Sequence, residues 1–587
     1  MFSIKNKFMC GIIGLISNSE IEKEKFNSLV SMLDHRGPDD KGVFFDDKIA
    51  LGQTRLSIID LSKAGHQPMI SKDQNYIITF NGEVYNFKEI KKELLSKGYK
   101  FNSNTDTEVL LNGYIEYKEK IVEKLNGMFA FAIYDKLLEK VFFARDRSGM
   151  KPLYYHQNKD GFYFSSEVKV LKHLSPKINF EAKVLYLLLG SVPEPFTIYE
   201  EILMFPSGNY GYYSNGNLDL SIFDEYNYEP KLTKPYKEIV KDVSVLMHNS
   251  IDRHLISDAP IGTFLSGGLD SSVITAIASK YRTNLQTVSL VFDSKKISEK
   301  YYQELIVDKF GTKHTEYLVD EKIFLNSIDS FMESIDQPTI DGLNTYFVSK
   351  AAKNAGLRTV LSGVGGDEIF YGYPSFKNSK KLHFLKKLPY FVISLLKQYK
   401  RYKKLDLLRI DNLLALYLPT RALFSPSEIS EILNIEVSEI YQIIVKMWES
   451  NQKPNAIYID DKISYLELNM YMKNQLLRDT DVFGMANSLE IRVPFLDKEL
   501  IDYVTRIDPK LKYNRNINKV ILADSVKGIL PSEIFTRPKM GFTLPFEEWF
   551  TNNINKFNLS EEAKAKFLSK EWSWSRIWAL IVLNKFN

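Results

Sequence analysis

The sequence contains very little cysteine: Cys10 is the only one among its 587 residues. A single thiol forms no disulfide within the chain, which suits a reducing compartment. The sequence also lacks an apolar run of about 18 residues, and it has no charged and then apolar leader that ends in small residues. These absences predict a cytoplasmic protein with no secretory leader and no stable membrane insertion.

The chain has no strong excess of either charge, since its formal net charge is only +4. Nucleic-acid-binding domains usually carry a clear basic excess, so we expect no nucleic-acid partner. Hydrophobic residues make up 44% and charged residues 26% of the chain, which is typical of globular proteins. Because single cores rarely grow beyond about 250–300 residues, this length predicts two large domains.

Cys10 lies in the stretch KFMCGIIG, directly after Met9. A free cysteine is often a small buried hydrophobe, and this is one interpretation of Cys10. The other interpretation depends on Met9: if translation starts there and Met9 is removed, the thiol stands beside its own free amine. That amine has a reference pKa of about 7.7–8.0 and can serve as the general base for a thiol nucleophile. Residues 1–9 are then a leader or a mis-assigned start, and we favour a start at Met9.

The first half of the sequence alternates short apolar stretches with turns. Strands are predicted at 11–16, 51–60, 76–86 and 128–135, with a Gly-Pro turn at 35–40. A helix is predicted from Phe87 to Gly98, where the glycine is a typical stop signal. These patterns indicate a strand-rich layered domain with helices. Residues 214–235 are rich in Asn, Asp, Gly, Tyr and Pro without clear periodicity, so we expect the interdomain linker there.

The strongest local pattern of the second half runs from Ala259 to Tyr281. An apolar strand at 261–265 leads into Ser-Gly-Gly-Leu-Asp-Ser-Ser and then into a helix, so the glycine loop lies at a helix N-terminus. Backbone N–H groups and the helix dipole favour a phosphate there. The lysine of the G-x-x-x-x-G-K-[ST] loop is missing, which argues against an ordinary nucleoside triphosphatase.

Two further strands follow this loop, at 287–293 and within 358–370, and the second ends in another glycine loop. Strands that alternate with helices predict a parallel, doubly wound sheet with its ligands at the carboxyl ends of the strands. We therefore expect the loops to meet at one nucleotide.

The chain resembles the glutamine-hydrolysing asparagine synthetase family over nearly its whole length. The resemblance rests on motifs in the family's order: MCGIIG, HRGPDD, TRLSIID, FNGEVYNF, NTDTEVLL, LNGMFAFAIYD, FFARDRSGMKPLYY, FSSEVKVL, SGGLDSS, SLEIRVPFLD and TRPKMGF. It implies an α/β protein in two parts. Residues 10–213 would form a class II glutamine amidotransferase domain of the αββα N-terminal-nucleophile type, and residues 236–587 an α/β doubly wound ATP-pyrophosphatase domain.

The resemblance also implies a role for each residue of a glutamine site. Cys10 would attack the side-chain amide of glutamine and form a thioester. The amide of Asn81 and the backbone N–H of Gly82 would form the oxyanion hole. Arg55 would bind the substrate carboxylate, and Glu83 and Asp106 would bind its ammonium group. Taken one at a time these residues have ordinary interpretations too, because Asn-Gly is a common hairpin turn and a lone charge usually faces solvent.

For the second half the resemblance implies an ATP site and Mg²⁺. The implied ATP-binding residues are Leu265, Ser266, Gly267, Gly268, Asp270, Ser271, Leu290, Ser362, Gly363 and Lys539. Asp270 and Asp367 would be near the metal ion, with Glu368 beside them. Lys539 alone would be interpreted as a solvated surface lysine.

The expected reaction is the amidation of L-aspartate with ATP and glutamine, giving asparagine, AMP and pyrophosphate. Ammonia must then pass between the two sites without being protonated by bulk water, which predicts an internal tunnel. The family also suggests a homodimer. A third interpretation is that the chain is a non-catalytic or glutaminase-only relative with the same fold. The intact SGGLDSS loop argues against it.

The sequence departs from the family at Val364, where aspartate-amidating members have a glutamate in the second glycine loop. A valine neither accepts a proton nor pairs with ammonia or a metal, so Val364 bears on the choice of acceptor. The alternative acceptor is a uronic acid sugar or another carboxylate in surface-polysaccharide biosynthesis. Residues 378–408 are dense in lysine, which is interpreted as a solvated helical face or as a surface for an anionic acceptor or a membrane.

Overall fold

The computed structural model describes residues 10–37, 39–175, 177–292, 299–389, 393, 400–450, 453–513, 518–537 and 545–586. The predicted leader or mis-assigned start at 1–9 and the predicted phosphate-binding Lys539 lie outside the described residues. Within the described residues, no helix combines the length and the apolar character needed to cross a membrane.

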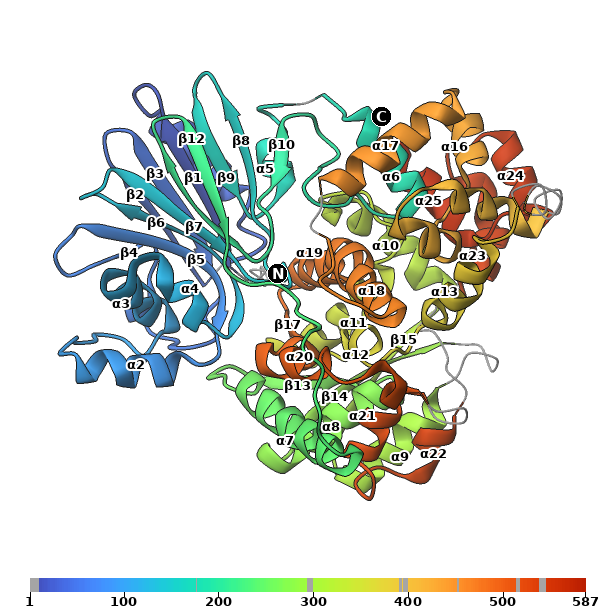
Figure 1. Cartoon of the computed structure of the whole chain (residues 1–587). Coiled ribbons are helices and arrows are strands. Elements are labelled where there is room, and N and C mark those ends of the chain that lie inside the picture. The colour runs from blue at the N-terminus through green and yellow to red at the C-terminus, as the bar shows by residue number, and fades with distance from the viewer. Residues whose placement is uncertain are drawn as a thin grey trace.

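The first half contains two antiparallel six-stranded sheets that face each other (Figure 1). One has the order β10-β8-β9-β1-β3-β2 and the other the order β12-β11-β7-β6-β5-β4. The strands of the first sheet are β1 (Gly11–Ser17), β2 (Asp40–Phe45), β3 (Ile49–Arg55), β8 (Tyr154–Asn158), β9 (Gly161–Ser165) and β10 (Ile202–Met204). Those of the second are β4 (Met69–Ile70), β5 (Tyr76–Val84), β6 (Gly127–Asp135), β7 (Lys140–Arg145), β11 (Asn209–Ser214) and β12 (Asn217–Ile222).

Three apolar clusters fill the spaces between the layers of this half. Residues of both sheets, such as Leu51 and Phe143, meet in the cluster between them. A second cluster lies between the outer face of the β5–β6–β7 sheet and the helices α2 (Phe87–Ser96), α3 (Asp106–Tyr117) and α4 (Ile121–Lys124). A third joins the outer face of the other sheet to α1 (Lys23–Ser31) and α5 (Val168–Leu171). The predicted αββα arrangement is therefore confirmed.

The second half is built on a five-stranded parallel sheet with the order β15-β14-β13-β16-β17. Its strands are β13 (Ile261–Phe264), β14 (Gln286–Phe292), β15 (Lys313–Val319), β16 (Thr359–Leu361) and β17 (Glu490–Arg492). The crossovers include α8 (Leu269–Tyr281), α9 (Lys300–Phe310), α10 (Glu321–Ser334) and α11 (Leu343–Asn354). This confirms the predicted parallel, doubly wound sheet.

The remaining described chain of this half is mostly helical (Figure 1). Its longer helices are α7 (Tyr236–His254), α13 (Pro374–Leu385), α16 (Pro426–Leu433), α17 (Val437–Glu449), α18 (Ile459–Leu466), α19 (Arg478–Ala486), α20 (Lys498–Val504), α23 (Phe546–Asn553), α24 (Glu561–Leu568) and α25 (Trp574–Asn584). The helix α6 (Phe180–Leu189) belongs to the first half of the sequence but packs in the same apolar core as these helices. Shorter ones are α12 (Gly366–Ile369), α15 (Leu418–Arg421), α21 (Val520–Ser525) and α22 (Ser532–Thr536), and the π-helical segment η5 spans Glu467–Leu477.

The segment predicted as a linker, 214–235, contains a strand. β12 pairs with β11 and closes one edge of the first half, so the irregular connection begins only at Phe223. Tyr226 and Tyr228 in this connection are buried in the main apolar core, which also explains why the segment is rich in tyrosine. In the basic segment 378–408, residues up to Leu385 belong to α13 and residues from Lys400 form a 3-10 segment.

Candidate active sites

A small pocket of the first half brings together all the residues predicted for glutamine. It is lined by Cys10, Arg55, Leu56, Ile58, Ile59, Gln67, Phe80, Asn81, Gly82, Glu83, Thr105, Asp106, Thr107 and Glu490. All of them except Glu490 come from the first half. Cys10 directly precedes β1, whereas Asn81, Gly82 and Glu83 lie near the end of β5.

The Cys10 thiol is held in its protonated form. Burial raises its pKa to about 11, although a hydrogen bond to the Leu56 carbonyl and the charge of Arg55 act in the opposite direction. The Sγ atom lies 3.6 Å from the Leu56 oxygen, and Arg36 Nε donates to the Cys10 carbonyl at 3.0 Å. A thiol with this pKa is neutral at pH 7, so it becomes a nucleophile only when a base takes its proton.

Asn81 and Gly82 sit in a strand rather than in a hairpin turn. They pair with Ala130 and Phe129 of β6, so the ordinary Asn-Gly turn interpretation is wrong here. The Asn81 amide nitrogen is buried and has no hydrogen-bond partner among the described residues. A buried donor left unpaired costs about 1–3 kcal/mol, which suggests that a ligand oxygen completes it.

Gly82 has a backbone conformation that other residues rarely adopt, with φ of 154°. A Cβ atom at this position would lie 2.1 Å from the Met128 carbonyl oxygen. Only glycine fits between the paired strands at this point, which holds its N–H beside the thiol pocket.

Glu83 and Asp106 form an acidic wall of the pocket. Burial raises the pKa of Asp106 to about 6, while the N–H groups of Val84 and Thr107 lower it. Burial also raises the pKa of Glu83 well above its usual value, against the nearby charge of Arg492. A cation beside two buried carboxyl groups stabilises their ionised form. This wall of the pocket therefore favours a cationic group of a ligand.

Arg55 lines the same pocket with its guanidinium directed at backbone oxygens. Nη1 donates to Ser62 at 3.1 Å, and Nη2 donates to Ile59 and Asp60 at 3.2 and 2.7 Å. In the absence of a ligand, main-chain carbonyls therefore hold the Arg55 guanidinium in place.

A second and larger cavity of about 670 Å³ lies at the carboxyl ends of the parallel strands. Most residues predicted for ATP line it: Leu265, Ser266, Gly268, Asp270, Ser271, Leu290, Ser362 and Gly363. The predicted metal residue Asp367, its neighbour Glu368 and the predicted acceptor-determining Val364 line it as well. Gly267 does not line it; its φ is 70°, and a Cβ there would meet Tyr302 at 2.8 Å. Its role is therefore to shape the loop.

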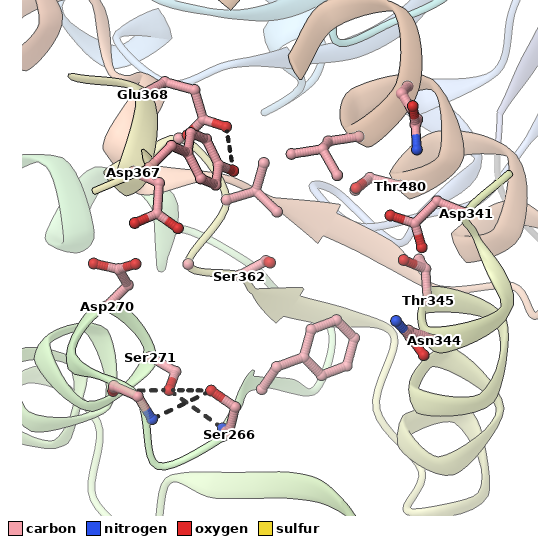
Figure 2. A pocket seen from close by; sticks show the side chains of 18 of the residues that line it. Ser266, Asp270, Ser271, Asp341, Asn344, Thr345, Ser362, Asp367, Glu368 and Thr480 are labelled. Atoms are coloured by element: carbon pink, nitrogen blue, oxygen red, sulfur yellow. Dashed lines mark hydrogen bonds between the residues drawn. The ribbon is translucent and has the colours of Figure 1, made fainter. Parts of the chain in front are cut away.

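The SGGLDSS loop is closed by its own serines, as Figure 2 shows. The hydroxyls of Ser266 and Ser271 lie 3.0 Å apart, and the Ser266 N–H donates to the Ser271 hydroxyl at 3.2 Å. The loop runs into α8 with Gly268 at its N-cap. The first N–H groups of a helix have no acceptor within the helix, and beside a tight glycine loop they are suited to a phosphate.

The sequence did not single out Lys519, which lies between two of the predicted carboxylates. Its Nζ is 2.6 Å from Asp367 and also forms an ion pair with Asp270. Burial disfavours the charged lysine, but the attraction of the two aspartates raises its pKa above the usual value. Lys519 has a left-handed backbone, with φ of 52°. Such a conformation costs about 1–3 kcal/mol in a non-glycine residue and is commonest at functional sites. No local pattern marked this lysine, because its partners are about 150 and 250 residues away.

The carboxylates of Asp270 and Asp367 lie close to each other on one side of the cavity in Figure 2. No group of three His, Cys, Asp or Glu residues among the described residues forms a ready-made metal site. Two carboxylates fit Mg²⁺ nevertheless, since this ion is commonly bound by one or two carboxylates together with the phosphates of its substrate.

The same cavity is also lined by Val364, Asp341 and Arg421. Figure 2 shows the Asp341 carboxylate beside Thr345 and Thr480. Burial raises the pKa of Asp341, and no cation among the described residues lies within ion-pair distance of it. Neither Asp341 nor Arg421 lies in a recognisable motif, so the sequence did not predict them.

Arg421 is fixed by neighbours on several sides. Its Nε and Nη2 atoms donate to Glu467 at 3.1 and 2.6 Å. Its guanidinium carbon lies 4.4 Å from the ring centre of Tyr373 and 3.9 Å from that of Tyr471. Nη1 has no hydrogen-bond partner among the described residues, so this edge remains for an anionic group.

Glu368 stands near Val364 with its carboxyl group buried. It accepts a hydrogen bond from the Tyr373 hydroxyl at 2.9 Å, drawn in Figure 2. Burial and the charge of Asp367 raise its pKa to about 7.

The two cavities lie on opposite sides of a narrow wall built by the second half. On α19, Thr480 lines the large cavity, whereas the next residue, Asp481, accepts from Arg36 Nη2 at 2.7 Å. Figure 1 places α19 and β17 between the sheets of the first half and the rest of the second half.

A protein with a thiol site for an amide on one side and a nucleotide site on the other can release ammonia and use it in the same molecule. This arrangement defines a glutamine amidotransferase joined to an ATP-dependent ligase. Comparison with known families agrees: residues 9–226 match the family described as "Glutamine amidotransferase domain", and residues 242–571 match "Asparagine synthase". The chain belongs to the asparagine synthase family and is a glutamine-dependent, ATP-using ligase.

Curated relatives match nearly end to end. Asparagine synthetase [glutamine-hydrolyzing] 1 of Bacillus subtilis (strain 168) is 33% identical over 577 residues, covering 95% of this chain and 90% of the relative. Asparagine synthetase [glutamine-hydrolyzing] 3 of the same organism is 30% identical, covering 94% and 89%. Asparagine synthetase B [glutamine-hydrolyzing] of Escherichia coli (strain K12) is 28% identical, covering 91% and 82%.

Proposed function

We propose that the chain synthesises L-asparagine: it hydrolyses glutamine to ammonia and amidates L-aspartate through an aspartyl-adenylate, releasing AMP and pyrophosphate. The names of the curated relatives support aspartate as the acceptor. The observation that carries the proposal is that the large cavity is lined by one anionic group, Asp341, and one cationic group, Arg421, beside the predicted nucleotide loops.

In the first half, the Cys10 sulfur attacks the amide carbon of glutamine, and ammonia leaves as a thioester forms. Water then cleaves the thioester to glutamate and restores the thiol. The unpaired Asn81 amide and the Gly82 N–H bind the oxyanion of both steps. Because the pKa of Cys10 is about 11, the attack needs a base, and a free amine on Cys10 itself is the proposed one.

In the second half, the loops at Ser266–Ser271 and Ser362–Gly363 bind ATP, with Lys519 at its phosphates. Mg²⁺ bound by Asp270 and Asp367 would neutralise charge on the pyrophosphate as it leaves. Transfer of AMP to the acceptor carboxylate is necessary because a carboxylate is a poor electrophile. Lys539 is proposed to add a second positive charge near the phosphates.

The acceptor is proposed to lie between Asp341 and Arg421. The α-ammonium of aspartate pairs with Asp341, and its α-carboxylate with the free edge of Arg421. The side-chain carboxylate is then directed past Val364 toward the nucleotide. Cytoplasm as the location and a homodimer as the assembly stay proposals that rest on composition and on the family.

One assay tests the acceptor directly. The full chain is given ATP, Mg²⁺ and glutamine with one acid at a time, and pyrophosphate release and the mass of the product are measured. L-Aspartate is expected to stimulate release and to yield asparagine. A uronic acid sugar that stimulates release where aspartate does not would replace the acceptor but keep the amidation chemistry.

Val364 provides a second test of acceptor choice. If the missing glutamate matters for aspartate, Val364→Glu should raise aspartate-dependent turnover by more than it changes the KM for ATP. Unchanged turnover would mean that this chain selects its acceptor with other residues, of which Asp341 is the first to examine.

A further inference from the structure

The strand β17 of the second half exposes its residues to two different sites. Glu490 lines the glutamine pocket, and the next residue, Ile491, lines the nucleotide cavity. Successive side chains of a strand point to opposite faces, so this short strand forms the wall between the sites. The glutamine pocket is therefore incomplete without the second half.

Arg492 is on the same face of β17 as Glu490 and is fully buried. Its Nε donates to Glu490 at 2.7 Å, and its Nη2 lies 3.3 Å from a carboxylate oxygen of Glu83. Its Nη1 donates to the carbonyls of His254 and Ile256 at 2.8 and 2.6 Å. A guanidinium fixed on three sides holds both carboxylates in place on one wall of the pocket.

The acids of this wall outnumber the cations that reach them. Glu83, Asp106 and Glu490 all line the pocket. Arg492 bridges two of them, and Lys151 lies 3.9 Å from Glu490 while also 3.5 Å from Asp481. One oxygen of Glu83 is buried without a hydrogen-bond partner among the described residues. The wall therefore attracts a cation, and the α-ammonium is the cationic part of glutamine.

We propose that the second half completes the glutamine site through β17, with Glu490 binding the substrate ammonium and Arg492 positioning Glu83 for the same group. The wall is also tied to the nucleotide loop, since the Ser362 N–H donates to the Arg492 carbonyl at 2.8 Å. This inference concerns the amide donor and holds whichever acid is amidated.

The test compares glutamine with glutaramate, which has the same amide and carboxylate but no α-amino group. Glutamate or glutarate formation by the full chain is measured for the wild type and for Glu490→Gln. The variant is expected to lower kcat/KM for glutamine about tenfold, mainly through KM, and to change that for glutaramate less than about twofold. A parallel loss with both substrates, or no loss with glutamine, would overturn the proposal.

Arg358→Gln is the matched control. It removes another ion pair between the halves, that of Arg358 with Asp39 at 2.6 Å, and neither residue lines the glutamine pocket. Its preference for glutamine should equal that of the wild type. If Glu490→Gln fails to fold, Glu490→Asp decides the question, since it keeps the charge and should keep the preference for glutamine; a preference lost in this folded variant would contradict the charge role.

Discussion

At the scale of single residues, the Cys10 thiol is the feature on which the first half depends. Its pKa of about 11 shows that burial alone does not activate it. The neighbouring donors at Asn81 and Gly82 stabilise an oxyanion but take no proton. A base next to the thiol is therefore required, and the prediction that the active chain begins at Cys10 supplies one.

Cys10→Ala removes the nucleophile and should abolish glutamine hydrolysis, while added ammonium salts still support acceptor-dependent pyrophosphate release. The reason is that the second half has its own substrates and its own cavity. Glutamate formation and pyrophosphate release are measured on the same preparation. Failure of ammonia to rescue synthesis would show that the two reactions are not divided between the halves.

Asp106 should make glutamine binding depend on pH. Its pKa of about 6 means that it is ionised above this pH and neutral below it. Only the ionised form attracts the substrate ammonium, so KM for glutamine should rise as the pH falls through about 6. The profile is measured by glutamate formation between pH 5 and about 8. Asp106→Asn should have a high KM with a flatter profile, and an unchanged profile would remove Asp106 from the ammonium site.

At the scale of elements, strand patterns predicted much of the fold. The alternation of apolar residues indicated the strands around 76–86 and 128–135, and the structure has β5 and β6 there. The helix predicted to stop at Gly98 ends at Ser96 as α2. The strand β12 was missed although Leu218, Leu220 and Ile222 alternate with polar residues, because the Asn, Asp, Gly and Pro around it favour an irregular segment.

The site was predictable where its residues lie in recognisable motifs. The SGGLDSS loop places five cavity-lining residues within a short stretch, and a single strand–loop–helix pattern reveals it. Lys519 and Arg421 reach their sites through tertiary packing alone. Their ion-pair partners are far away in the sequence, so a single sequence carries no signal for them. Glu490 stands in the SLEIRVPFLD motif, but the motif does not tell which of the two cavities this side chain lines.

Lys519→Met tests the contact between the start of α21 and the nucleotide loops. Loss of the positive charge of the Lys519 side chain should reduce acceptor-dependent pyrophosphate release by at least about a hundredfold. Glutamine hydrolysis should persist. Lys527→Met, an exposed lysine of the same region, is the matched control and should behave like the wild type. Normal pyrophosphate release by Lys519→Met would exclude this lysine from the phosphate site.

Gly82→Ala tests the strand β5. The added Cβ would meet the Met128 carbonyl at 2.1 Å, so the β5–β6 ladder must move and the oxyanion donors with it. We expect a lower Tm and strongly reduced glutamine hydrolysis. Gly216→Ala, also at positive φ but with open space around it, should cost only about 1 kcal/mol. Full glutaminase activity in Gly82→Ala would contradict the proposed oxyanion hole.

At the scale of the whole molecule, the two cavities meet where the halves join. Buried ion pairs join the halves at Arg36 with Asp481 and at Glu83 with Arg492. The wall at β17 is thin, because the neighbouring residues Glu490 and Ile491 line opposite cavities. A passage for ammonia through this wall stays the prediction.

The most direct measurement follows the nitrogen atom. The full chain receives ATP, Mg²⁺, L-aspartate and glutamine labelled with ¹⁵N in its amide, together with an equal concentration of unlabelled ammonium, and the asparagine formed is analysed by mass spectrometry. The proposed function with internal transfer predicts asparagine that carries ¹⁵N in nearly every molecule. Asparagine with the label diluted to the proportion in solution, or no asparagine at all, would contradict it.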